Sequence, residues 1–410
     1  MKHFHQSLFP WLMGIALLSF SCADDHSDHN NPTPTGSNIL KGTIKTDMAL
    51  VNSSADIDYY VEEIVYMEAK MTIEPGTVIV GKAGSGIVFS TAKGVLVANG
   101  TKALPIVFKS ESGAKGGWLG IRFDESNNPL NSLKFVTIAD GGASSFDGDN
   151  TRKANLQFYG TNQVQMKGCQ IRNSAAHGIF ENFNSNLTII GFDSNRFESN
   201  TDFPILMYDQ NARSLGLGNE FPANGRNFIG LRQKEFTGLP GNHTWKKHAV
   251  PYYWEDNANL VVGYYDTNGS LTLEAGVQLI MGPGTGIVVG DNANTTGWLK
   301  MTGSGSEKIR IRGESNVAGF WKGILIRTNS VNNDFLHAII GDAGSTNLSL
   351  DPSKANIVVD TDSRLKMANV ELVNSAGCGY TYRTDTSDPA TVTVSGMTYS
   401  ANNSGNVCTY

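Results

Sequence analysis

The chain of 410 residues carries a net charge of −6, with 32 lysines and arginines against 38 aspartates and glutamates. This balance argues against a nucleic-acid-binding protein, because phosphate backbones are held mainly by basic surfaces. Hydrophobic residues make up 40% and aromatic residues 9%, which excludes a largely disordered chain. The 45 glycines stand among valine, isoleucine, threonine and asparagine, a mixture that favours short strands joined by tight turns. We therefore expect an all-β protein.

The amino terminus is typical of a secretory signal. Lys2 precedes an apolar run over residues 8–18 that is shorter than the roughly 18 to 20 residues needed to cross a bilayer. Small residues then lead to Cys22, with Phe20 as a departure from the usual pattern. The segment is similar to the signals of bacterial lipoproteins, which implies that Cys22 is lipidated as the first mature residue. The alternative is cleavage nearby, with Cys22 left free.

A flexible tether is expected to follow the signal peptide of residues 1–21. Residues 22–40 are rich in proline and in small polar and acidic residues, and they lack apolar periodicity. The acidic residues directly after Cys22 resemble the surface-export signal of lipoproteins from Bacteroidetes. This resemblance implies an outer-membrane protein that is held by its lipid and faces the cell surface, while the leaflet itself stays open.

An internal repeat at a spacing of about 200 residues is the strongest signal in the chain. Seven segments recur in the same order: residues 71–79, 84–88, 94–96, 105–108, 117–121, 153–155 and 173–175 match residues 271–279, 284–288, 297–299, 308–311, 320–324, 354–356 and 374–376. Chance does not produce colinear matches over more than a hundred residues. We therefore divide the chain into two similar halves, residues 41–240 and 241–410.

Within each half, short apolar strands follow one another about every ten residues without helical periodicity. A right-handed parallel β-helix explains this pattern, because each turn contributes two or three strands and stacks on the turn beneath it. Asparagines at equivalent bends then lie above one another and form ladders, for which Asn173, Asn195 and Asn219 are suited. Exposed strand edges at the ends need covering. The segment before Ile73 and the carboxyl-terminal residues 378–410 are the expected caps.

Several segments carry a family resemblance that spans about residues 40–400. Those at residues 73–76, 117–121, 131–138, 200–205, 217–221 and 245–252 are similar to the right-handed β-helix lipoproteins and secreted proteins common in Bacteroidetes. The resemblance implies a pectin-lyase-like solenoid. It leaves the activity open, because this architecture carries enzymes, adhesins and binding proteins alike.

No catalytic set stands out. A glycan hydrolase needs two carboxylates across a groove, and a lyase needs a base beside a positive group. The segment 200–202 resembles one motif of polygalacturonase-like hydrolases, but its companion motifs are absent downstream. Asp140 and Asp342 occupy equivalent places in the two halves, as do Trp118 and Trp321, so we interpret these residues as structural.

Metal ligands and cysteines give weaker signals. Asp147 and Asp149 are weak candidates for a Ca²⁺ site, although the spacing and the closing glutamate of an EF-hand are missing. No other cofactor is expected. Cys378 and Cys408 could form a disulfide in an oxidising compartment. His177 corresponds to Cys378 in the repeat, so a histidine is not a fixed feature of the unit.

Aromatic residues of the second half are the candidate ligand-binding residues. Rings beside polar groups grip the apolar faces of sugars or contact proteins, although strand aromatics also simply alternate between the two faces of a sheet. The candidates are Tyr252, Tyr253, Trp254, Tyr264, Tyr265, Tyr380 and Tyr382.

Together these observations predict a lipid-anchored solenoid that binds or displays without a covalent step. The expected partners are the membrane, through the anchor, and a polysaccharide or a glycoprotein of the host or matrix, with no nucleic acid. Two alternatives remain, a polysaccharide lyase or glycoside hydrolase acting in a groove, and an outer-membrane scaffold that binds no ligand. Converging acidic and basic residues favour the enzyme, and a row of solvent-facing tyrosines and tryptophans favours the binder.

Overall fold

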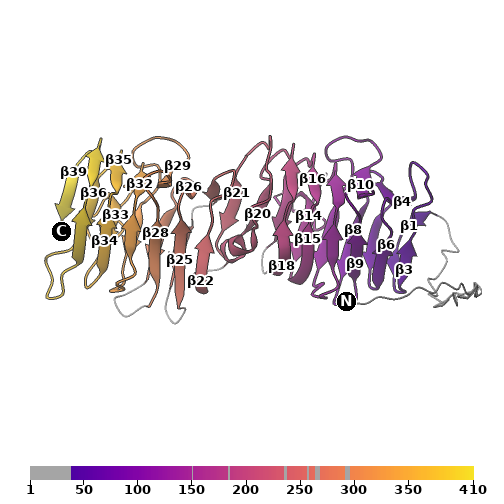
Figure 1. Ribbon diagram of the computed structural model, residues 1–410, viewed down its shortest axis with the longest axis horizontal. Helices are drawn as coiled ribbons and strands as arrows, with labels where there is room; N and C mark the ends of the chain where they lie inside the picture. The colour runs from indigo at the N-terminus through magenta and orange to yellow at the C-terminus, as the bar shows by residue number, and fades with distance from the viewer. Residues whose placement is uncertain are drawn as a thin grey trace, which may run out of the picture. The chain divides into compact units, whose positions relative to one another are not determined.

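The computed structural model describes residues 38–149, 151–182, 185–234, 238–255, 258–263, 268–290 and 296–410. Over these residues the chain forms strands from β1 (Ile39–Leu40) to β39 (Gly405–Thr409) and a short 3₁₀ helix, η1 (Asp209–Ser214). Neighbouring strands pair in parallel and stack coil upon coil (Figure 1). The prediction of a parallel β-helix is therefore confirmed. No helix in the described part of the chain is long and apolar enough to span a membrane.

The strands form five sheets, of which the first three begin in the amino-terminal half. Sheet 1 contains β1, β4 (Tyr59–Val61), β7 (Val78–Gly81), β10 (Ile106–Ser110), β13 (Val136–Ala139), β16 (Gln170–Arg172) and β19 (Arg196–Glu198). Sheet 3 contains β3 (Met48–Leu50), β6 (Lys70–Ile73), β9 (Val95–Asn99), β12 (Ser132–Lys134), β15 (Thr161–Lys167) and β18 (Asn186–Asp193).

The long sheet runs through both halves with 14 strands. Its strands from the first half are β2 (Thr43–Ile44), β5 (Ile64–Met67), β8 (Gly86–Ser90), β11 (Ile121–Asp124), β14 (Ala154–Tyr159), β17 (His177–Glu181) and β20 (Ile205–Tyr208). They are followed by β21 (Ile229–Arg232), β23 (Tyr252–Trp254), β26 (Gln278–Met281), β29 (Ile309–Gly313), β32 (Ala338–Gly341), β35 (Glu371–Val373) and β38 (Thr398–Ser400).

Two further sheets complete the second half. Sheet 4 contains β22 (Gly241–Trp245), β25 (Gly269–Glu274), β28 (Trp298–Thr302), β31 (Asp334–Leu336), β34 (Arg364–Ala368) and β37 (Thr391–Ser395). Sheet 5 contains β24 (Asn259–Val262), β27 (Gly286–Val289), β30 (Ile324–Ile326), β33 (Ala355–Val359), β36 (Cys378–Tyr382) and β39.

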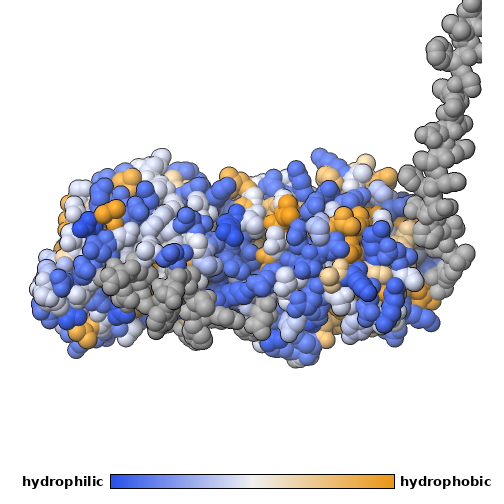
Figure 2. Space-filling view, turned by 90° about the horizontal axis from the view of Figure 1, so that it is seen from below, coloured by the Kyte–Doolittle hydropathy of each residue, from blue (hydrophilic) through white to orange (hydrophobic). Residues whose placement is uncertain are grey.

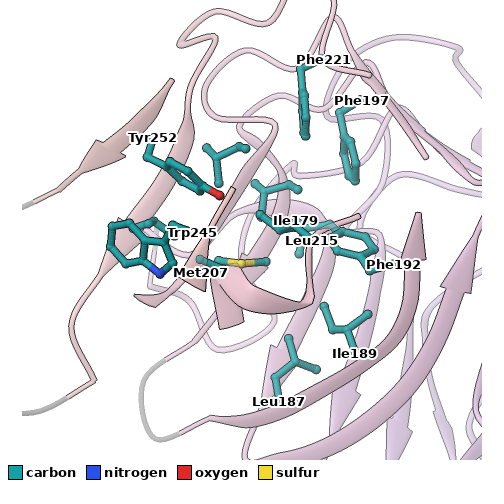
Figure 3. Packing of buried hydrophobic residues seen from close by; sticks show 14 of the residues in the cluster. Ile179, Leu187, Ile189, Phe192, Phe197, Met207, Leu215, Phe221, Trp245 and Tyr252 are labelled. Atoms are coloured by element: carbon teal, nitrogen blue, oxygen red, sulfur yellow. The ribbon is translucent and has the colours of Figure 1, made fainter. Parts of the chain in front are cut away.

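The core lies inside the coils, where like residues stack in register. The rings of Phe89 and Phe158 flank that of Phe123 with centroids 5.3 and 5.6 Å away. Each such side chain contributes about 1.5–3 kcal/mol by leaving water. Between the halves the core continues without a break, with Phe197 stacked on Phe221 beside the residues around η1 (Figure 3).

Asparagine ladders line the bends, as predicted for two of the three named residues. Asn195 donates to the side-chain oxygen of Asn219 at 3.1 Å, and Asn200 donates in the same way to Asn224 at 2.9 Å. The prediction for Asn173 is wrong: its backbone is left-handed, with φ 58°, and its amide bonds the Asp140 carboxylate instead. Asparagine is among the few residues that adopt this conformation readily.

The two halves match strand for strand, β3–β20 with β22–β39. Their shared side chains make the same bonds: the indole nitrogens of Trp118 and Trp321 each donate to a backbone carbonyl at 2.7 Å. Both indoles are fully buried. The interpretation of these two residues as packing residues is confirmed.

The equivalent strands nevertheless join different sheets. In the first half β6, β7 and β8 belong to sheet 3, sheet 1 and the long sheet. Their counterparts β25, β26 and β27 belong to sheet 4, the long sheet and sheet 5. We call the matched strands β3–β20 the first copy and β22–β39 the second copy. The long sheet joins one face of the first copy to a different face of the second, and this change of sheet partners takes place over η1, β21 and β22. No pattern in the sequence indicated this change of sheet partners.

The expected caps are not separate structures. Residues 39–73 form β1–β6, and residues 378–410 form β36–β39 (Figure 1). Both segments continue the sheets because their apolar residues alternate as in the other coils. The caps before Ile73 and over residues 378–410 stay a prediction. The signal peptide, Cys22 and the tether as far as residue 37 lie outside the described residues.

Candidate functional site

Of the aromatic residues expected to bind a ligand, those that the structure describes do not form an exposed surface. Tyr252, Tyr253 and Trp254 form β23 and are 1%, 3% and 0% exposed. Tyr380 is also buried, and the ring of the half-buried Tyr382 stacks on it at 6.0 Å. Tyr264 and Tyr265 lie outside the described residues.

The position of β23 explains this burial. Tyr252 and Trp254 enter the core, where Tyr252 packs against Trp245, while Tyr253 lies in a second apolar cluster on the outer side of the long sheet. β4 is the counterpart of β23, and the two strands share their tyrosine pair as Tyr59–Tyr60 and Tyr252–Tyr253. The aromatic pair is thus a feature of the coil and not special to the second half.

A groove of about 580 Å³ opens on the outer side of the long sheet, over β17, β20 and β21. Side chains from three successive coils meet there because equivalent strands stack in register. Its lining combines an apolar floor with charged walls: Thr151, Lys153, Ala175, Ala176, His177, Phe180, Thr201, Asp202, Leu206, Arg232 and Glu255.

His177 and Asp202 form one wall of this groove. The imidazole Nδ1 lies 3.8 Å from the Asp202 carboxylate, and the ring stacks on Phe180 and Phe203 with centroids 5.5 and 5.9 Å away. Burial lowers the pKa of His177 to about 4, against the opposing effect of Asp202 and with a further contribution from Arg232. The imidazole is therefore neutral at neutral pH. His177 Nδ1 and Asp202 Oδ1 have no hydrogen-bond partner among the described residues.

Two arginines lie against the aromatic floor. The Arg232 guanidinium sits 4.7 Å from the centre of the Phe180 ring and donates to the backbone carbonyl of Glu181. The Arg226 guanidinium lies 4.2 Å from both the Phe203 and the Tyr253 rings. Such cation–π contacts hold a charged group in a defined place.

Carboxylates fix the second arginine from its other side. Glu255 and Glu314 lie 3.7 and 3.5 Å from Arg226, and the Tyr253 hydroxyl donates to Glu314 at 2.9 Å. Arg226, which lies beside the groove, is therefore held in one place by contacts on both sides.

Two further carboxylates lie behind the groove and do not line it. Glu181 is fully buried and accepts bonds from the Tyr208 amide and the Asn211 side chain at 2.9 Å; burial raises its pKa. Burial, helped by Glu181, raises the pKa of Asp209 to about 7. These groups lie in the core beside η1, where solvent does not reach them.

The weak metal candidates are engaged by arginines. Asp147 lies 3.2 Å from Arg152 and 3.9 Å from Arg122, and Asp149 lies 2.9 Å from Arg152. Across the described ranges, no group of three or more His, Cys, Asp or Glu side chains is placed to hold a metal ion.

The second copy is closed at the place where the first copy opens. Cys378 and Cys408 form a disulfide on the outer side of sheet 5. Cys378 occupies the position of His177, since each donates its backbone amide to the equivalent Lys354 or Lys153 carbonyl. Cys408 pairs with β36 as Leu206 pairs with β17. The sequence analysis did not predict this groove. The one signal that could have indicated it was the difference between His177 and Cys378 at equivalent positions of the repeat.

Comparison with family models, curated proteins and solved structures finds no match for this chain. The family resemblance therefore stays an expectation. What can be said of the site rests on the residues of this chain and on the comparison of its own two copies.

Proposed function

We propose that the protein is a lipid-anchored surface protein that binds a glycan in the groove formed by His177, Asp202, Arg232 and their neighbours. One observation carries the proposal. At equivalent positions of the repeat, the first copy has an open groove with charged walls and the second has a disulfide. Because the second copy folds with Cys378 and Ser404 in place of His177 and Asp202, the fold of the unit does not require those two side chains.

The chemistry of the groove suits a neutral sugar. Phe180 and Leu206 lie at the base of the groove and are 2% and 3% exposed, so the polar side chains along its walls, Lys153, Thr201 and Asp202, are the groups that can pair with hydroxyls. Positive and negative side chains line the groove in similar number, so a strongly charged ligand gains little.

Surface anchoring belongs to the same proposal. It rests on the signal-like residues 1–21 and on Cys22, which would hold the solenoid at the outer membrane beyond the tether. A polysaccharide or a glycoprotein of the host or matrix is then the accessible partner. A scaffold without ligand is the contrary case, and it predicts no glycan binding at all.

Glycan cleavage is a second candidate, favoured by the presence of two carboxylates, Asp202 and Glu255, beside His177 in one groove. A hydrolase requires such a pair, and a lyase could use the neutral imidazole as its base with Arg232 near the developing charge. Binding without cleavage is preferred because a general acid needs a raised pKa. Burial raises the pKa of Glu181 and Asp209 beside the groove, but both are enclosed in the core and cannot reach a glycan in it.

A glycan array probed with the purified protein tests both candidates. Ser404 of the second copy is equivalent to Asp202, because the backbone amides of these two residues donate to equivalent carbonyls, those of Gly377 and Ala176. Asp202→Ser therefore gives the first copy the residue that the second copy has at this position. We expect this variant and Lys153→Gln to weaken binding of any glycan hit, whereas Lys354→Gln, at the matching position of the second copy, does not. New reducing ends or unsaturated products would support cleavage, and failure of every glycan to bind would refute the proposal.

A further inference from the structure

A second groove, of about 430 Å³, lies at the corner between sheet 3 and sheet 1. It is away from the outer side of the long sheet, and Phe135, between β12 and β13, stands in it. The Phe135 side chain is one of the large apolar groups left exposed, at 37%. Figure 2 shows hydrophobic residues in small patches on a mostly hydrophilic surface.

The backbone of Phe135 is in a conformation that this residue type avoids. Its φ is 48°, and the same corner of the next two coils is occupied by Gly168 and Ser194 with φ 66° and 58°. In the second copy the corner carries His337, at φ 48°, and Asn369. Phe135 is the only large apolar residue with positive φ in the described part of the chain. Strain of this kind persists where a side chain serves a purpose other than folding.

The ring of Phe135 packs against the next coil. A Cβ atom at Gly168 would lie 2.9 Å from the ring, so the ring rests directly on this glycine of the next coil. Polar side chains surround the groove: Thr101, Lys102, Gln170, Arg196 and Glu220. Arg196 is fixed by Glu198 at 2.9 Å and by Glu220.

We propose that Phe135 is a stacking platform for one sugar ring, with Lys102, Gln170 and Arg196 binding its hydroxyls. A flat aromatic ring that is supported from below and flanked by planar polar groups suits the apolar face and polar rim of a pyranose. The inference rests on the proposed function in that the ligand is a glycan. It places an additional subsite on a different corner of the solenoid from the His177 groove.

Phe135→Asn is the decisive variant, because asparagine accepts the left-handed conformation. We expect its melting temperature to equal or exceed that of the wild type. Its affinity for the best of a panel of glucose, mannose, xylose and galacturonate hexasaccharides should fall by about three- to tenfold, as expected for loss of one ring stack. His337→Asn, at the equivalent corner, should leave affinity unchanged, and Phe135→Trp should retain it.

The outcomes separate this inference from the proposed groove. Unchanged affinity in Phe135→Asn, or a lower melting temperature, overturns the stacking role. If only Asp202→Ser weakens binding, glycan binding in the His177 groove is supported and sugar stacking on Phe135 is refuted. If only Phe135→Asn weakens binding, stacking on Phe135 is supported and binding in the His177 groove is refuted. A wild type that binds none of the hexasaccharides refutes both.

Discussion

Strand pairs β17–β20 and β36–β39 occupy equivalent positions in the two copies and differ in what they place on the outer side of the sheet. The first pair presents His177 and Leu206 in an open groove, and the second presents Cys378 and Cys408 in a disulfide. Features that both copies need for folding recur, such as the buried indoles and the bonds of Asn131 and Asn333 to equivalent backbone amides. Features that do not recur, such as the groove beside His177 and the Cys378–Cys408 disulfide, are specific to one copy.

The largest predicted effect concerns the shared core. Trp118→Ala and Trp321→Ala should each lower the free energy of unfolding by about 3–5 kcal/mol, because each removes a buried indole and leaves a carbonyl unbonded. Urea denaturation followed by circular dichroism measures this loss. The equivalence of the copies fails if one indole can be removed at much lower cost than the other.

The disulfide should matter only to the second copy. Replacing Cys378 and Cys408 by alanine opens a link between residues 30 apart and should cost about 2–4 kcal/mol. Hydrogen exchange should quicken in β36–β39 and stay slow in β17 and β20. Faster exchange over both copies would contradict the independence of the two sites.

His177 should give the first copy a pH dependence that the second lacks. Its pKa in the folded protein is about 4, below the ordinary value of 6.5, so the unfolded chain binds more protons between these pH values. Stability is therefore full above about pH 6.5 and is lost as the pH falls toward 4, by up to roughly 3 kcal/mol.

His177→Phe keeps the ring stack and removes the titrating group. The difference in unfolding free energy between wild type and variant, measured from pH 4 to pH 7, should follow this curve. A difference that does not vary with pH would show that the imidazole is not held neutral.

The smallest effect is expected on the groove wall. The Asp202 side chain is 39% exposed, and Asp202→Ser should change the free energy of unfolding by less than about 0.5 kcal/mol. Thermal denaturation checks this value. A large loss would make Asp202 a structural residue and would remove the reason for assigning it to a ligand.

The solenoid was predictable because its signal is repeated. Equivalent residues such as Trp118 and Trp321, and the ladder from Asn195 to Asn219, follow from stacking like positions coil upon coil. The prediction of an asparagine ladder at Asn173 was wrong, because the left-handed backbone of this residue turns its side chain toward Asp140.

The candidate site could not be predicted because its residues are not repeated in the sequence. Its residues, from Lys153 to Glu255, come from coils around the junction of the copies, where η1 replaces a strand and the regular spacing is lost. Burial of Tyr253 was also hidden, because an outward-facing residue of a strand is normally exposed, whereas here Phe203 and Arg226 cover it. Phe135 gives no signal in sequence, because its conformation and its seat on Gly168 appear only once the coils are stacked.

The change of sheet partners at the junction bears on how a long polymer can be held. β17 belongs to the long sheet and its counterpart β36 to sheet 5, so equivalent strands of the two copies face in different directions around the solenoid. A chain-like molecule following the long sheet past His177 meets side chains of an unrelated kind further along. The long sheet therefore does not carry two aligned, identical grooves, and in the second copy the Cys378–Cys408 disulfide stands at the place of the groove.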